Sequence, residues 1–329
     1  MSFVSIIVPC YNEQATIRLL LSSIYSQTYP REAMEVIIAD GRSTDQTLKE
    51  IAIFNKDHPD LLVKIVDNPQ RIIPAGLNRA IQNAKGEIIV RLDGHSMPNP
   101  DYVARCVDAL KQGCGDNVGG VWEIRSRDNS WQARSIATAA AHPLGVGDAY
   151  YRVGRRPQEV DTVPFGAFKK TLIDRIGLFN EALLTNEDYE FNTRVRQAGG
   201  IIWMDPKIST VYFPPKSIVE LARQYWRYGY WKGRMLQRYP GSIRWRQALP
   251  PAYVFSLLIF GILGIWLPVA RWMLIIQIGI YILVMFFAAV NACIKKRDVG
   301  LLLGLPVAIA TMHMVWGAAF LWSLVRRNK

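Results

Sequence analysis

Short apolar runs alternate with longer helical patterns over the first 112 residues of the chain. Residues 3–8, 35–39, 62–67 and 87–92 have the length and the apolar character of buried strands. Helices are predicted over residues 13–27, from a capping box at Ser43 and Gln46, from Pro74 to about residue 84, and from Asn99 to Lys111. Repeated βα units of this kind predict an α/β fold whose mostly parallel sheet is covered by helices.

The pattern becomes irregular after residue 115. Short strands are predicted near residues 118–124 and 163–169, and a helix near residues 188–198. Ser217 and Glu220 form a second capping box, which opens a helix at about residues 217–238. Tyrosines and tryptophans alternate with arginines and lysines in this helix, so we expect it to lie at a membrane surface.

The last third of the chain contains three stretches without a charged residue, at 247–270, 272–294 and 299–325. Each reaches the roughly 20 residues that a helix needs to cross the bilayer core. We therefore predict a cytosolic domain at residues 1–240 and a membrane domain at 247–329, with spans at 252–270, 272–294 and 299–325. Buried helices of a soluble core are the alternative.

The charge of the chain is concentrated in its C-terminal part. The net charge is +12, yet residues 1–215 hold 24 basic and 25 acidic residues, whereas residues 216–329 hold 15 basic and 2 acidic ones. A basic segment beside apolar stretches suits anionic lipids better than nucleic acid, so we expect no nucleic-acid partner. The four cysteines lack the spacing of a zinc site or a disulfide framework, which favours a reducing compartment.

Polar residues gather where three of the predicted strands end. They are the runs Pro9-Cys10-Tyr11-Asn12-Glu13, Asp40-Gly41 and Asp93-Gly94-His95. In parallel sheets, ligands bind beyond the carboxyl ends of the strands. The carboxylate of Asp93 and the imidazole of His95 could both meet one divalent cation, and such a cation could hold a diphosphate.

Together these motifs resemble the family 2 glycosyltransferases, which have the GT-A fold, over about residues 3–230. The resemblance rests on the opening run at 8–13, the loop Asp40-Gly41-Arg42-Ser43-Thr44-Asp45, the segment with Asn78, Ala84, Gly86 and Glu87, the acidic pair Glu187-Asp188 and the run Gln224-Tyr225-Trp226-Arg227-Tyr228. Asp-Gly-His, the run at 76–80 and the three terminal apolar stretches look most like the glucosyltransferases of succinoglycan-type exopolysaccharide assembly. Leu77, where many relatives have Arg, and His95, where Asp is usual, depart from the family pattern.

The resemblance assigns the donor site to residues at the strand ends. Pro9, Tyr11, Asn12 and Glu13 would bind a UDP-sugar, with Tyr11 stacked on the base and Glu13 on the ribose, and Asp40 would accept from the uracil imide. Tyr11 and Glu13 could instead simply start a helix, and Asp40 could be a turn residue.

The resemblance also assigns the metal and the diphosphate. Asp93 and His95 would hold Mn²⁺ or Mg²⁺, with the imidazole favouring Mn²⁺. Gln224 and Arg227 would face the diphosphate. His95 could instead be a loop residue without a metal, and Arg227 could bind a lipid phosphate.

Glu187 and Asp188 would be the catalytic acidic pair, with Asp188 as the general base for the acceptor hydroxyl, which implies a single displacement with inversion. The alternative is that the two acidic residues only favour a helix N-terminus.

We therefore expect a multi-pass enzyme of the bacterial cytoplasmic membrane whose catalytic domain faces the cytoplasm. It would transfer a hexose, with glucose favoured, from a UDP-sugar to a polyprenyl-diphosphate-linked saccharide, with membrane lipids as further partners. Transfer to polyprenyl phosphate, processive polysaccharide synthesis and an inactive scaffold of an export complex are the alternatives. A nucleotidyltransferase is disfavoured, since no glycine-rich loop follows the first predicted strand.

Overall fold

The computed structural model describes residues 1–326, which divide into two compact units. The first comprises residues 1–123 and 150–212, and the second residues 124–149 together with the chain from residue 213 onward. The chain therefore passes from the first unit into the second at residue 124 and returns to the first at residue 150. The sequence pattern does not reveal this excursion. The predicted division at residue 240 into a cytosolic and a membrane domain remains a prediction.

A nine-stranded sheet forms the centre of the first unit, in the order β3-β2-β1-β4-β8-β6-β9-β5 with β7 paired to β9. Its parallel half consists of β1 (Val4–Cys10), β2 (Met34–Asp40), β3 (Leu62–Asp67) and β4 (Ile88–Arg91). The remaining strands are β5 (Met97–Pro98), β6 (Asn117–Ile124), β7 (Gln158–Glu159), β8 (Ala167–Lys169) and β9 (Ile202–Tyr212). Because β8 runs antiparallel to both β4 and β6, the sheet is mixed rather than mostly parallel.

Helices cover both faces of this sheet, because alternate residues of each strand point to opposite sides. Residues 4, 6, 8 and 10 of β1 pack against α1 (Ile17–Tyr25), α2 (Thr47–Asp57) and α4 (Tyr102–Lys111). Ile7 packs on the other face, against α3 (Ile73–Asn83), α8 (Leu172–Ile176) and α9 (Glu187–Gln197). Two short elements, η1 (Arg31–Ala33) and α7 (Tyr150–Val153), complete the unit.

The strand predictions hold closely for the parallel half, but one predicted helix start is wrong. Helix α2 begins at Thr47, and its N-cap Gln46 makes no side-chain capping bond. Ser43 instead donates its hydroxyl to Asp40 at 2.6 Å and accepts from the backbone of Asn12 at 2.9 Å. The hydroxyl expected to cap a helix thus joins the loops that follow β1 and β2.

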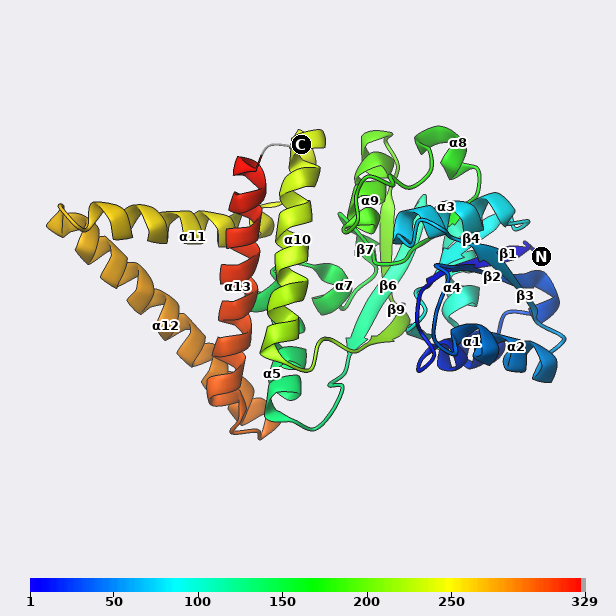
Figure 1. The fold of residues 1–329 in the computed structure, drawn as a ribbon, viewed down its shortest axis with the longest axis horizontal. Coiled ribbons are helices and arrows are strands. Elements are labelled where there is room, and N and C mark those ends of the chain that lie inside the picture. The colour runs from blue at the N-terminus through cyan, green and yellow to red at the C-terminus, as the bar shows by residue number, and fades with distance from the viewer. Residues whose placement is uncertain (327–329) are drawn as a thin grey trace. The chain divides into compact units, whose positions relative to one another are not determined.

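The second unit is helical: α5 (Trp131–Ala140), α6 (Pro143–Val146), α10 (Ile218–Arg238), η2 (Pro240–Ser242), α11 (Trp245–Leu263), α12 (Pro268–Lys296) and α13 (Leu301–Val325). Helices α11, α12 and α13 are long and apolar enough to cross a membrane. Helix α10 runs along α13 (Figure 1), where Gly229 and Gly233 allow close approach, since a Cβ at either would lie within 2.3 Å of an α13 atom. Ser217 caps α10 as predicted, accepting from the Glu220 backbone at 3.3 Å. The Glu220 carboxylate accepts from the Lys216 backbone at 3.3 Å rather than from Ser217, so the predicted capping box forms only in part.

The predicted spans 252–270 and 272–294 place the break between the first two apolar helices at residue 271. In the structure this break lies earlier in the chain. Helix α11 ends before Gly264, and Pro268 begins α12. Arg271, where the predicted break lies, is inside α12 and donates to the carbonyls of Gly264 and Ile265. Turn residues, rather than the charge, separate these helices, because proline suits the first turn of a helix and the arginine reaches back to the exposed carbonyls.

Candidate active site

The loops that follow β1, β2 and β4 meet at one edge of the sheet. The backbone of Gly41, after β2, donates to the carbonyl of Cys10 at 2.7 Å. Gly94, after β4, lies against Glu13, and a Cβ at this position would approach the Glu13 Cγ within 2.9 Å. The glycine after β4 therefore lets that loop contact the loop after β1, as the strand-end pattern predicts.

A fully buried arginine lies at the centre of this edge. Arg91 ends β4 with 1% of its side chain exposed, and its guanidinium contacts three carboxylates. The Nη2 atom lies 3.1 Å from Asp93 Oδ1 and 2.8 Å from Glu187 Oε1, and Nη1 donates to Asp188 Oδ1. Buried charges need such partners, and the planar guanidinium can serve several carboxylates at once.

The three carboxylates differ in how much of them reaches solvent. Asp93 is 20% exposed, Asp188 is 24% exposed and Glu187 only 10%. Asp93 and Asp188 can therefore touch a ligand on the open side, while Arg91 lies beneath them. The arginine donates only to Oδ1 of Asp93. These bonds orient the carboxylate, and its Oδ2 takes no part in them.

Asp188 is held from two directions. Besides Arg91, the backbone N–H of Phe165 donates to its Oδ2 at 3.4 Å. Phe165 and Gly166 both have positive φ angles, 64° and 83°, and the Gly166 carbonyl accepts from the Arg91 backbone at 3.0 Å. This strained turn before β8 thus connects the arginine to the second oxygen of Asp188.

Burial of the carboxyl, with the nearby charges of Glu187 and Asp93, raises the pKa of Asp188 to about 8, although Arg91 favours the ionised form. The same three carboxylates raise the pKa of Arg91 further above its usual value, despite its burial. The arginine is therefore a permanent cation, and Asp188 is a stronger base than an ordinary aspartate.

The residues expected to bind the nucleotide surround the loop after β1. Tyr11 is exposed, and the guanidinium of Arg71 lies 5.7 Å from the centre of its ring. Asn12 has a positive φ of 54°, and its side-chain carbonyl accepts from the Thr44 backbone at 2.8 Å. Pro9 is buried within β1, in register with Ala39 of β2.

Asp40 and Glu13 are more engaged with the protein than their predicted roles require. Asp40 is buried, and its two oxygens accept from the hydroxyl and the backbone N–H of Ser43 at 2.6 and 3.0 Å. Glu13 contacts His95 Nδ1 at 3.0 Å and the Thr16 hydroxyl at 2.5 Å. Both side chains therefore shape the loops, and their contacts to a base or a ribose remain predictions.

Gln224 and Arg227 lie on α10 in the second unit. Gln224 donates to the Tyr228 hydroxyl at 2.9 Å, and Arg227 is exposed. Their contact with a diphosphate also remains a prediction.

A divalent cation suits the residues at the end of β4 in part. Among residues 1–326, no three His, Cys, Asp or Glu side chains form a ready-made metal site. Asp93 nevertheless presents one carboxylate oxygen that Arg91 does not contact, and His95, two residues later, is half exposed with its Nδ1 3.0 Å from Glu13. With its carboxylates ionised, the cluster around Arg91 carries two net negative charges, which one divalent cation would neutralise. A site with so few protein ligands fits a cation whose other ligands come from a diphosphate.

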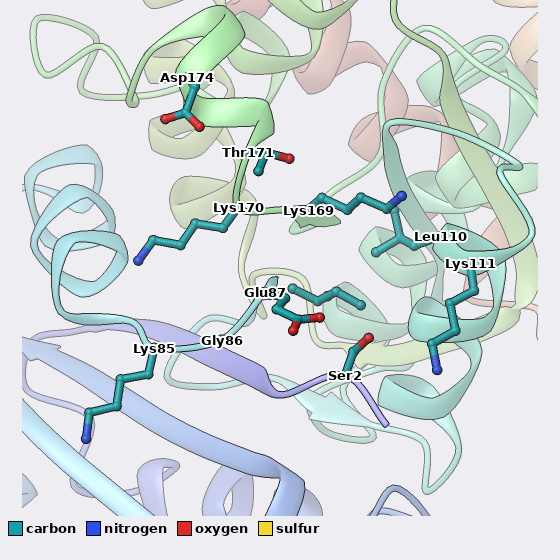
Figure 2. Close-up of a pocket in the computed structure, with 11 residues that line it drawn as sticks. Ser2, Lys85, Gly86, Glu87, Leu110, Lys111, Lys169, Lys170, Thr171 and Asp174 are labelled. Carbon is teal, nitrogen blue, oxygen red and sulfur yellow. The ribbon is translucent and has the colours of Figure 1, made fainter.

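A cavity of the first unit lies away from this edge. About 730 Å³ in volume, it lies where β4 begins, whereas Asp93 follows the end of that strand. Figure 2 shows the lysine side chains around it, which are Lys85, Lys111, Lys169 and Lys170. None of the predicted site residues lines it, so the candidate active site is the open edge around Arg91.

Comparison with known proteins decides the family. The profile of glycosyl transferase family 2 matches residues 5–177, which is more than half of the chain. The chain belongs to this family. It is 31% identical over 319 residues to the succinoglycan biosynthesis protein ExoA of Rhizobium meliloti, covering 96% of this chain and 93% of that protein. It is also 27% identical over 334 residues to a dolichyl N-acetyl-alpha-D-glucosaminyl phosphate 3-beta-D-2,3-diacetamido-2,3-dideoxy-beta-D-glucuronosyltransferase of Methanococcus voltae, covering 100% and 99% of the two chains.

Solved structures confirm the GT-A fold of this family 2 glycosyltransferase. The mannosyltransferase PcManGT of Pyrobaculum calidifontis, in complex with GDP-Man and Mn²⁺, matches 98% of this chain and 87% of its own with a TM-score of 0.63 at 23% identity. S. aureus TarS 1–349, in complex with UDP, matches 77% of this chain and 78% of its own with a TM-score of 0.51 at 18% identity. The predicted family, fold and glycosyltransferase class are thus confirmed.

Sequence reasoning missed Arg91, although a signal for it exists. A single charged residue interrupts the apolar run 88–92, two positions before Asp93. Because side chains alternate along a strand, residues 91 and 93 point to the same face, so the charge was available to pair with the aspartate. The partnership with Glu187 and Asp188, nearly 100 positions later, has no such local signal.

Proposed function

We propose that this glycosyltransferase transfers a hexose, with glucose favoured, from a UDP-sugar to a polyprenyl-diphosphate-linked saccharide, with inversion and with a divalent cation. The observation that carries the proposal is the placement of Asp93 and Asp188 on one buried guanidinium, with the open side of both carboxylates facing solvent. One carboxylate suits the donor's cation, and the other suits the acceptor's hydroxyl.

Asp188 acts as the general base in this proposal. Its raised pKa, about 8, increases its affinity for a proton, and general-base assistance contributes roughly 10²–10⁴-fold to a rate. In this proposal neither neighbouring carboxylate acts as a nucleophile, because Glu187 is nearly buried against Arg91 and Asp93 is assigned to the cation. We therefore propose a single displacement, with inversion at the anomeric carbon.

Asp93 and His95 would hold Mn²⁺ or Mg²⁺ at the donor diphosphate. A cation there supplies Lewis-acid stabilisation of the negative charge on the leaving group. Tyr11 is exposed and able to stack on a base, and Asn12 and Glu13 fix the loop that carries it. The UDP preference rests on the family resemblance and on the UDP bound to the TarS structure.

The lipid-linked acceptor is supported by the second unit and by the relatives' names. Three helices are long and apolar enough to place the chain in a membrane, where an acceptor's lipid tail would also reside. The Methanococcus relative is named for a dolichyl-linked sugar acceptor, and the Rhizobium relative for succinoglycan biosynthesis. We infer a multi-pass enzyme whose first unit lies on the cytoplasmic side of the membrane, with the basic α10 at its surface.

The test is release of UDP by the purified full-length protein in detergent, supplied with Mn²⁺, a panel of UDP-hexoses and a lipid-linked saccharide. Asp188→Asn should lower turnover at least about 100-fold, because the amide cannot accept the proton. Asp57→Asn, a change at an exposed aspartate of α2, serves as the matched control and should keep full activity. Full activity of Asp188→Asn would remove the base assignment, and no UDP release with any donor would remove the function.

A further inference from the structure

We infer that Arg91 is the positioning residue of the active site, holding the base Asp188 and the cation-binding Asp93 at a set separation. This inference rests on the proposed function, since it concerns how the proposed base is placed. Arg91 does not touch the substrate, because with 1% exposure it lies beneath the carboxylates. Its effect on the reaction must therefore pass through the side chains that it contacts.

The contacts of Arg91 come from two distant parts of the chain. Asp93 lies two residues after the end of β4, whereas Glu187 and Asp188 open α9, and four strands, β5 to β8, lie between β4 and α9 in the sequence. Asn186, just before α9, has a positive φ of 69° and makes no side-chain capping bond. The guanidinium contacts thus fix where this helix end lies relative to β4.

The geometry favours an arginine over a lysine here. Nη1 serves Asp188, while Nη2 serves Glu187 and Asp93, and Nε adds a second contact to Asp93 at 3.3 Å. A planar guanidinium presents these donors in fixed directions, so it sets both the distance and the orientation of the carboxylates. A lysine ammonium would keep the charge but act as a single point donor without that fixed geometry.

Glu187 belongs to the same device. It is 10% exposed, and its carboxylate lies 2.8 Å from the Arg91 guanidinium, so it is the most buried of the three carboxylates that this arginine contacts. The two acidic residues that start α9 therefore have different roles in this inference. Asp188 faces the substrate, and Glu187 holds the arginine in place. This differs from the sequence prediction, in which both residues of the pair are catalytic.

The test compares Arg91→Lys with wild type in the full-length protein, by steady-state kinetics with varied UDP-sugar and by thermal unfolding. A positioning role predicts a kcat lower by about 10- to 100-fold, with KM for the donor changed less than about threefold, since misplacement of catalytic groups acts on the transition state. Arg194→Lys is the matched control, because Arg194, in the later part of α9, also donates through two nitrogens to a buried glutamate, Glu190, at 2.7 and 3.0 Å. It should lower the melting temperature and leave kcat unchanged.

A double variant separates this inference from the proposed function. In the Asp188→Asn background, Arg91→Lys should lower kcat by a smaller factor than it does in wild type, since only the contact with Asp93 remains to act through and residues that act through one another are not additive. If Asp188→Asn is inactive while Arg91→Lys keeps wild-type kcat, the positioning role is overturned and the proposed base stands. If Asp188→Asn is fully active, the proposed base itself is wrong.

Should Arg91→Lys fail to fold, Glu187→Gln provides the second measurement, because it loosens the guanidinium while leaving its charge. A fall in kcat of at least about threefold at unchanged KM supports the role. Wild-type kcat in the folded Glu187→Gln protein overturns it.

Discussion

The ionisation of Asp188 should set how the catalytic rate depends on pH. Burial raises the pKa of this carboxyl to about 8, and only the ionised form can take a proton from the acceptor. For a single group with this pKa, roughly a tenth of the enzyme is ionised at pH 7 and roughly nine tenths at pH 9. We therefore expect kcat/KM to rise about tenfold between these values and to level off above them.

The assay is UDP release at low donor concentration across this range, because kcat/KM reports the ionisation of the free enzyme. Mg²⁺ should be run beside Mn²⁺ to keep the metal's own hydrolysis out of the profile. The residual rate of Asp188→Asn should lose the dependence. A wild-type profile that is flat from about pH 6 to 9, with an unchanged melting temperature, would refute the assigned pKa or the role of Asp188.

The same shift has a consequence for stability. The folded chain keeps the Asp188 proton up to about pH 8, whereas an unfolded aspartate loses it near its usual pKa of 3.8. The folded state therefore binds more protons between these values, so the contribution of Asp188 to the free energy of unfolding falls as the pH rises through them.

Two further predictions concern the sheet and the cation. Gly120→Ala in β6 would place its Cβ 1.5 Å from the backbone carbonyl of Ile208 in β9, so it should destabilise the protein by about 2 kcal/mol or more in thermal unfolding, while Gly241→Ala, with open space around it, should have little effect. Equal melting temperatures of the two variants would contradict the close strand approach. His95→Ala should raise the Mn²⁺ concentration for half-maximal activity about 10- to 100-fold, with little change in melting temperature, because the side chain is half exposed. An unaltered Mn²⁺ dependence would leave His95 as a loop residue paired with Glu13.

Local signals in the sequence predicted the parallel half of the sheet well. The predicted run at 62–67 coincides with β3, and the run at 87–92 contains β4. A short strand can be predicted from a few consecutive residues, because its apolar pattern depends only on neighbours in the chain. The prediction for the loop at 43–46 is wrong for the complementary reason, since its serine accepts from Asn12, 31 positions away, and donates to Asp40 rather than capping the helix that follows.

The sequence alone also determined the family, the polar strand ends and the three apolar helices, since each depends on residues that are close together in the chain. Only the tertiary structure decided that Arg91 gathers Asp93, Glu187 and Asp188, and that residues 124–149 pack with the C-terminal helices. The physical reason is that a buried charge must find its partners wherever the fold supplies them, and that choice depends on which distant segments the sheet and the helices bring together.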